Sequence, residues 1–170
     1  MFSFKIIRKL INLGPLILLY YLSISEIDSH FENYFEILSF NIQLIIIYFW
    51  VSKRPEALGG GHIFFAGLIN DVVTGFPLGL SSLSYLTVSL VANYVKNMTV
   101  NTRITTDWFT FFIAIFFSNL ILFILLSKFS EITVSVTEIS YNTFFTLLFF
   151  PFFWFLFTYY NSIITTGKHA

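Results

Sequence analysis

The sequence predicts an all-α polytopic membrane protein, and two observations lead to this fold class. First, 56% of the 170 residues are hydrophobic and only 11% are charged, whereas about a quarter of the residues in a soluble domain are charged. Second, charge-free stretches recur along the whole chain, at 10–25, 37–52, 72–95, 108–127 and 139–167. A membrane-crossing helix needs roughly 20 apolar residues, so these stretches leave no room for a soluble domain. We expect residues 1–170 to form a single membrane domain.

The charged residues between the apolar stretches indicate the direction of each crossing, because Lys and Arg are concentrated on the cytoplasmic side of membrane proteins. With six crossings, eight of the nine Lys and Arg residues lie in the cytoplasm and six of the nine acidic residues lie outside. No assignment with an odd number of crossings does as well. We therefore expect a bundle of six transmembrane helices with both termini in the cytoplasm. The expected spans are 9–25, 36–52, 56–75, 80–98, 107–127 and 141–163.

The first expected span follows a basic segment, as the apolar part of a signal peptide does. No A-x-A-like cleavage site follows this segment, and further apolar stretches come after it. We therefore expect the segment to be retained as a membrane span.

The middle of the chain allows two topologies. Between Arg54 and Lys96 the chain must cross the membrane outward and return. At about 1.5 Å per residue, 56–75 and 80–98 are each just long enough for a hydrocarbon core of roughly 30 Å, with GFPLG (75–79) as the turn. Pro55 fits the start of the third helix, because its missing N–H costs nothing there. A re-entrant hairpin is the alternative.

Other residues mark the expected ends and bends of the spans. Asp107 is suited to be the N-cap of the fifth span. Pro151 lies inside the sixth span and predicts a kink there. Aromatic residues near segment ends fit the belts that line membrane surfaces; they are Trp50, Tyr94, Trp108, Tyr159 and Tyr160.

The stretch GLINDVVTGFPLGL (67–80) places Asp71 in an otherwise apolar run. A carboxylate costs about 2.5–3.5 kcal/mol at the membrane centre and less near the edge, so we expect Asp71 to face the bundle interior. Gly67, Asp71 and Gly75 are spaced at i, i+4 and i+8 and share one helix face. That face lacks bulk, so a neighbouring helix can approach closely.

Asp71 has two interpretations. In the first, the carboxylate binds a proton or cation, but a proton path needs several ionisable groups, and Asp71 is the only acidic residue that lies away from the ends of the expected spans. In the second, which we favour, it ties the end of the third span to the GFPLG turn, where glycines allow sharp bending and Pro77 fixes its own φ. Its other possible partners are polar residues on adjacent spans, namely Asn41, Gln43 and Asn93.

No other motif indicates catalysis or a metal site. His30 lies among acidic residues in the first outer loop, but no second histidine accompanies it, and His62 is alone beside three glycines. The chain has no cysteine, which excludes disulfides and thiolate chemistry. The sequence has no Ser/His/Asp set, phosphate loop or paired carboxylates. We expect no catalytic, cofactor-binding or metal-binding residue, and no enzyme.

The pattern G-L-x-x-D-x-x-x-G-x-P-x-G resembles the signature segment of the MreD family of bacterial rod shape-determining proteins. Its residues here are Gly67, Leu68, Asp71, Gly75, Pro77 and Gly79. The chain length, the basic amino terminus, the Arg54–Pro55 pair before the signature and the six-span layout agree with the family. The resemblance covers essentially the whole chain.

The resemblance implies a non-enzymatic, multi-pass protein of the bacterial inner (plasma) membrane. Such a protein belongs to the complex that builds the lateral cell wall and is needed for the regulation of cell shape. Family members work with the bitopic MreC protein, the actin-like MreB filament, a SEDS-type glycan polymerase and its transpeptidase partner. The expected partners are these proteins and the lipid bilayer, with no nucleic acid and no cofactor.

The resemblance also provides a second hypothesis, because MreD-like proteins are thought to share the fold of the S components of ECF vitamin transporters. The protein would then hold a small ligand within its bundle. The outer loops contain no polar cluster suited to a charged vitamin, so the first hypothesis is favoured. A third class, a proton-coupled carrier, rests on Asp71 alone.

Overall fold

The structure, a computed structural model, describes residues 2–25, 41–98, 103–129 and 136–166. Within these residues every regular element is an α-helix, as the sequence predicts. The helices are α1 (Phe2–Ile24), α2 (Ile42–Lys53), α3 (Gly60–Thr74), α4 (Leu80–Met98), α5 (Ile104–Phe129) and α6 (Val136–Thr166). Residues 36–40 of the expected second span lie outside the described residues.

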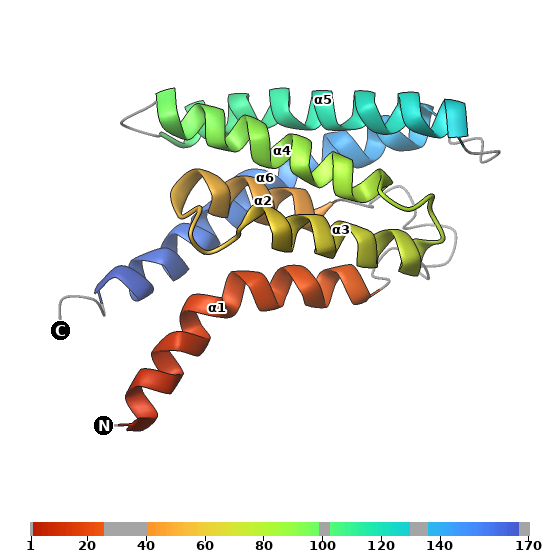
Figure 1. Ribbon diagram of the computed structural model, residues 1–170. Helices are drawn as coiled ribbons and strands as arrows, with labels where there is room; N and C mark the ends of the chain where they lie inside the picture. The colour runs from red at the N-terminus through yellow and green to blue at the C-terminus, as the bar shows by residue number, and fades with distance from the viewer. Residues whose placement is uncertain (1, 26–40, 99–102, 130–135, 167–170) are drawn as a thin grey trace.

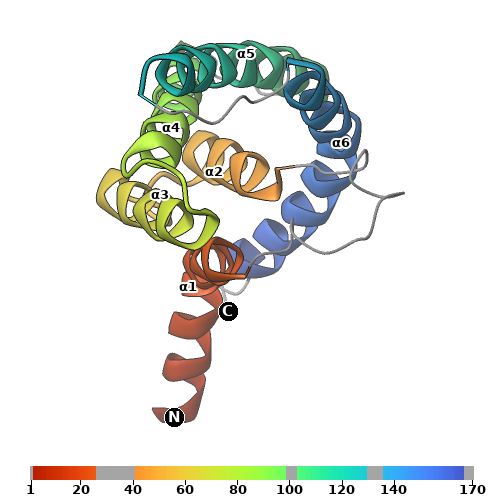
Figure 2. The same cartoon turned by 90° about the vertical axis from the view of Figure 1, so that its right-hand side faces the viewer.

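Helix α2 forms the centre of the bundle. Its residues from Leu44 to Ser52 are all buried, and Figure 2 shows the other helices arranged around it. A helix that is apolar on every side is typical of a protein core or of a membrane span, and the burial of these residues shows that α2 lies in the core of the bundle. With 12 residues, α2 is about 18 Å long, which is shorter than the hydrocarbon core of a bilayer.

Aromatic side chains join α2 to α5 and α6. The rings of Phe111 and Phe150 stack with centroids 4.3 Å apart, and Tyr48 lies 5.1 Å from Phe111. The next residue of α2, Phe49, packs against Phe157 of α6 with ring centroids 5.5 Å apart. Aromatic pairs at these separations stabilise a core beyond the area they bury. The inner part of α6 is thereby fixed against the central helix.

Helices α3 and α4 approach each other closely at Gly67. A Cβ atom on Gly67 would lie 2.4 Å from the Cα of Ser82 and 2.6 Å from its backbone nitrogen. The Ser82 hydroxyl donates to the Phe64 carbonyl at 2.9 Å. Glycine is required here because the neighbouring atoms belong to backbone, which cannot move aside as a flexible side chain can.

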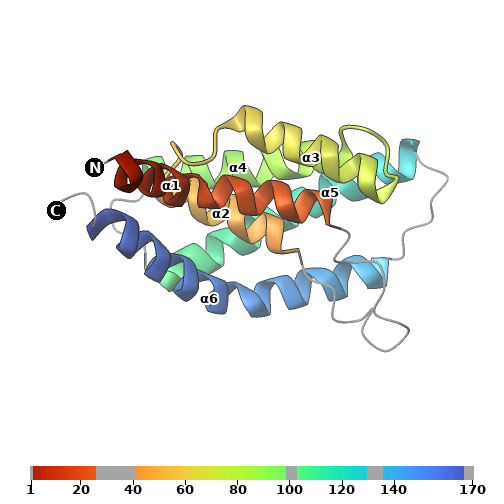
Figure 3. The same cartoon turned by 90° about the horizontal axis from the view of Figure 1, so that it is seen from below.

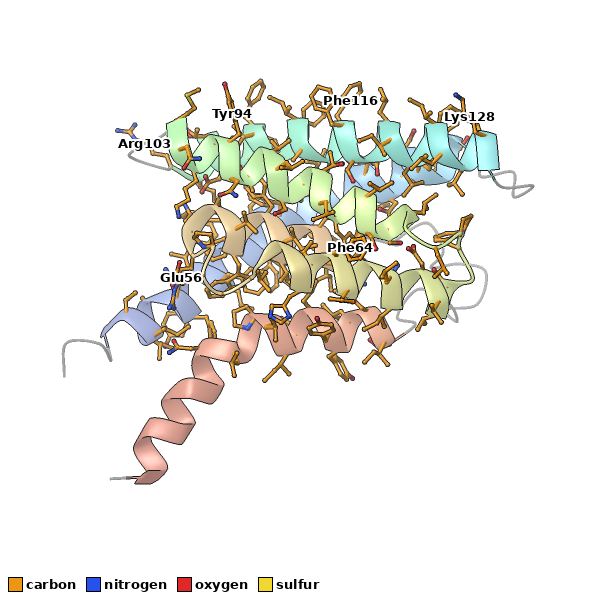
Figure 4. All side chains as sticks on the ribbon, in the orientation of Figure 1. Glu56, Phe64, Tyr94, Arg103, Phe116 and Lys128 are labelled. Atoms are coloured by element: carbon orange, nitrogen blue, oxygen red, sulfur yellow. The ribbon has the colours of Figure 1, made fainter. Side chains whose placement is uncertain are left out.

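Two of the described helices are long and apolar enough to cross a membrane, α5 over Ile104–Lys128 and α6 over Ile139–Thr165. Shorter apolar stretches occupy Asn12–Ile24 and Ile42–Lys53. Figure 4 shows Phe116 of α5 pointing away from the bundle, and this side chain is more than half exposed. Large apolar side chains on the outside suit a protein surrounded by lipid.

The prediction that Pro55 starts the third helix is wrong. Helix α2 ends at Lys53, where the Arg54 N–H donates to the Trp50 carbonyl at 2.6 Å. The chain then forms a turn in which the Ala57 N–H donates to the Arg54 carbonyl at 2.9 Å. Gly59 is extended, so α3 begins only at Gly60.

Two helices contain an internal proline and both are bent. Pro15 lies inside α1, whose first half points away from the bundle (Figure 1). Pro151 lies inside α6, and Figure 3 shows the bend in α6 that this proline predicts. A proline in a helix removes one hydrogen bond and clashes with the preceding turn, so a change of direction follows.

The helices run alternately between the two ends of the bundle. Figure 1 shows both termini at one end, together with the connection between α2 and α3, whereas the connection between α3 and α4 lies at the other end. We call the end with the termini the inner end and the opposite one the outer end.

We predict that Gly67→Ala destabilises the protein, because its methyl group would overlap the backbone of α4. Overpacking of this kind costs about 1–3 kcal/mol. Gly61→Ala on the same helix is the matched control, since nothing lies within 4 Å of a Cβ at that position. Thermal unfolding of both variants in detergent checks the prediction. Equal midpoints for the two variants would contradict it.

Candidate functional site

The carboxylate of Asp71 caps the outer end of α4. Asp71 is fully buried near the end of α3. Its Oδ2 accepts a hydrogen bond from the Gly79 N–H at 2.7 Å, and its Oδ1 accepts one from the Ser81 N–H at 2.8 Å. The first N–H groups of a helix have no partner within the helix. A carboxylate there accepts hydrogen bonds from these N–H groups, and its negative charge interacts favourably with the positive end of the helix dipole.

Asp71 also ends its own helix. Its carbonyl accepts from the N–H of Gly75 and, at 3.0 Å, from that of Phe76. Gly75 has φ 71° and Gly79 has φ 97°, both in the region that favours glycine. One residue therefore closes α3 with its main chain and opens α4 with its side chain, while the two glycines allow the turn between them.

Two further contacts complete the turn between α3 and α4. The Leu80 N–H donates to the Pro77 carbonyl at 3.2 Å, and the Asn70 amide donates to the Ser81 hydroxyl at 3.0 Å. We name this group the Asp71 turn; it consists of Asn70, Asp71, Gly75, Pro77, Gly79 and Ser81. The structure thus brings four of the five candidate residues into one turn, and the fifth, Gly67, lies one helical turn before Asp71.

The other polar residues considered as partners of Asp71 lie elsewhere. The side chain of Asn41 caps α2 by accepting from the Leu44 N–H at 3.2 Å. The amide of Gln43 donates to the Leu22 carbonyl at 3.2 Å, and Asn93 is exposed on α4.

A second buried carboxylate lies toward the inner end. The Oδ2 atom of Asp107 is 2.8 Å from the ammonium of Lys53 on α2 and accepts from the Trp154 indole of α6 at 2.8 Å. The ammonium also lies 5.8 Å from the centroid of the Trp154 ring. Asp107 is fully buried. This cluster joins three helices that are distant in sequence.

The prediction that Asp107 is the N-cap of the fifth span is wrong. Helix α5 begins at Ile104, so Asp107 lies within its first turn. Its side chain faces a cation on another helix instead of the N–H groups of its own. The signal in the sequence was the pair of opposite charges, Lys53 and Asp107, at ends of two apolar stretches expected on the same side of the membrane.

Uncharged polar pairs join neighbouring helices between these two carboxylates. The hydroxyls of Ser84 on α4 and Ser118 on α5 are hydrogen-bonded. The Asn119 amide donates to the Thr143 hydroxyl of α6 at 2.6 Å. Hydrogen bonds of this type help to hold helices together in lipid, where no hydrophobic effect drives helices together.

The described residues contain no group of three or more His, Asp or Glu side chains placed to hold a metal ion. His62 is exposed, with its Nδ1 atom 3.3 Å from the Tyr20 hydroxyl. His30 lies outside the described residues. The buried charged and polar groups described above are thus used to cap helices and to join them.

We predict that Lys53→Met alone destabilises the protein strongly, because it leaves the buried Asp107 carboxylate without its cation. Breaking one side of a buried ion pair costs about 3–5 kcal/mol. Adding Asp107→Asn should recover most of the loss, since the amide oxygen still accepts from the Trp154 indole and no charge remains. Thermal unfolding of the single and double variants measures this. A double variant no more stable than Lys53→Met would contradict the pairing.

A family model described as rod shape-determining protein MreD matches residues 7–161. No curated protein and no solved structure matches the chain. The matched range includes the Asp71 turn, the Lys53–Asp107 pair and all six helices in whole or in part. It also agrees with the resemblance indicated by the signature segment from Gly67 to Gly79. The chain therefore belongs to the MreD family of rod shape-determining proteins.

Proposed function

We propose that this protein is a non-enzymatic component of the bacterial inner membrane, acting in the complex that elongates the cell wall. The family match implies a role in rod shape determination and is the observation that carries the proposal. It supports this function and not the ligand-binding function of an ECF S component. In this proposal the partners are an MreC-like protein, MreB, a SEDS-type polymerase and its transpeptidase.

The geometry of Asp71 supports a scaffold rather than a proton-coupled carrier. Both carboxylate oxygens accept hydrogen bonds from backbone N–H groups at 2.7 and 2.8 Å. A carrier needs a group that gains and loses a proton during each cycle. Protonation of Asp71 would place a hydrogen on an oxygen that already accepts from an N–H donor, and would weaken the start of α4. The carboxylate is suited to a fixed structural role.

We further propose six membrane crossings with both termini in the cytoplasm. The common position of the termini supports this topology (Figure 1). Figure 4 adds that Arg103 lies toward the inner end and Lys128 toward the outer end. Because α3 has 15 residues and is about 22 Å long, the bilayer thins locally or the adjoining turns enter it.

Reporter fusions test the topology. We expect reporters at positions 30, 77 and 133 to be periplasmic, and those at 55, 101 and 170 to be cytoplasmic. Paired reporters that are active only on one side of the membrane measure this directly. A cytoplasmic signal at 77 would favour a re-entrant hairpin over 56–98 and remove the two crossings.

Substitutions of Asp71 test the scaffold role in cells that lack the native protein. Asp71→Asn keeps one acceptor oxygen, so we expect reduced abundance but a rod shape at matched protein level. Asp71→Leu, of similar volume, keeps no acceptor and leaves two N–H groups unpaired in the bundle, at about 1–3 kcal/mol each. We expect that variant to be lost from the membrane and the cells to round.

The measurements are cell width and the amount of protein in the membrane. If Asp71→Asn accumulates at the native level and the cells are round, the charge or proton of Asp71 is the functional feature. The carrier function would then replace the scaffold.

A further inference from the structure

We propose that two consecutive residues of α5, Asp107 and Trp108, hold the proline kink of α6 from both sides. We call this arrangement the kink clamp; it consists of Asp107, Trp108, Leu147, Pro151 and Trp154. Trp108 is a positioning residue in it, acting on the direction of α6.

The first half of the clamp follows from the chemistry of proline. In a regular helix the N–H of residue 151 donates to the carbonyl of residue 147. Pro151 has no N–H, so the Leu147 carbonyl loses this donor. The Trp108 indole donates to that same carbonyl at 3.0 Å. In lipid no water is present to replace a missing donor, and the indole of a neighbouring helix supplies it.

The second half of the clamp lies on the other side of Pro151. The Trp154 indole donates to Asp107 Oδ2 at 2.8 Å, and Lys53 holds the same oxygen at 2.8 Å. One helix thus contacts α6 at Leu147, before the proline, and at Trp154, after it. Two indoles donate in opposite directions across the same helix pair, which fixes where α6 bends.

Because of the kink, the part of α6 before Pro151 contacts α5 and the part after it contacts α2. Before the proline, Thr143 of α6 accepts from Asn119 of α5. After it, the Phe157 and Tyr160 rings lie 6.2 and 5.9 Å from the Trp50 ring of central helix α2. Figure 3 shows the change of direction between these two parts. A displacement of the inner end of α5 would therefore redirect the inner half of α6.

The clamp explains the position of Trp108 better than the aromatic belt expected from the sequence. Trp108 is about half exposed, as a belt residue would be. Its indole N–H, however, donates to a main-chain carbonyl of the adjacent helix instead of to lipid head groups.

A double-mutant cycle tests the clamp. Trp108→Phe removes the donor and keeps an aromatic ring, while Pro151→Ala restores the N–H for the Leu147 carbonyl. We expect Trp108→Phe to lower the unfolding midpoint of the native protein by about 3–8 °C. In the Pro151→Ala background the same change should cost less than half as much. Phe112→Leu, another exposed aromatic residue of α5, controls for lost ring surface and should cost the same in both backgrounds.

An equal loss from Trp108→Phe in both backgrounds would overturn the proposal, because the indole would then not act through the carbonyl that Pro151 frees. If Pro151→Ala variants do not accumulate, a distance measurement decides instead. The chain has no cysteine, so spin labels can be placed through Phe144→Cys and Tyr159→Cys, two exposed positions on either side of the kink. We expect Trp108→Phe to shift or broaden the label distance, and Phe112→Leu to leave it unchanged. An unchanged distance in Trp108→Phe would also overturn the clamp.

Discussion

The hydrogen bonds between the Asp71 carboxylate and the first turn of α4 determine how the middle of this chain is built. Helices α3 and α4 must reverse direction within five residues, and the backbone groups at both helix ends need partners that lipid cannot provide. Asp71 provides partners at both ends, because its carboxylate accepts from N–H groups at the start of α4 and its carbonyl accepts from N–H groups after the end of α3. With the start of α4 fixed, its Ser82 meets Gly67 at backbone distance and its Ser84 reaches Ser118 of α5.

The same constraint operates at other points of the bundle. Asn41 caps the half-buried start of α2, and its own N–H donates to the Thr146 hydroxyl at 2.9 Å. Trp108 provides a donor for a carbonyl that a proline frees. In each case a side chain satisfies a main-chain group that has lost its helical partner. Polar residues in this protein therefore stand where the regular backbone pattern is interrupted.

The sequence predicted those features that depend on neighbours along the chain. The all-helical fold, the bend at Pro151 and the link between Asp71 and its turn follow from composition, from proline chemistry and from a spacing of a few residues. The roles of Asp107 and Trp108 could not be derived in this way. Each role depends on a residue of another helix, Lys53 for Asp107 and Leu147 for Trp108. The local sequence predicted an N-cap for Asp107, which is wrong, and a belt position for Trp108, which does not include its bond to Leu147. The predicted start of α3 at Pro55 was wrong for a similar reason, because Pro55 lies in the turn that follows the end of α2.

The enclosed position of α2 has a consequence for the order of assembly. Because its side chains are apolar in nearly every direction, α2 can face lipid before the helices that follow it in the chain surround it. On the proposed topology, α2 enters the membrane before α3 to α6 have been synthesised. Its rings at Tyr48, Phe49 and Trp50 then face lipid first and protein later. The central helix can thus lie in the bilayer before α3 to α6 are inserted, and these helices pack around it as the chain is completed.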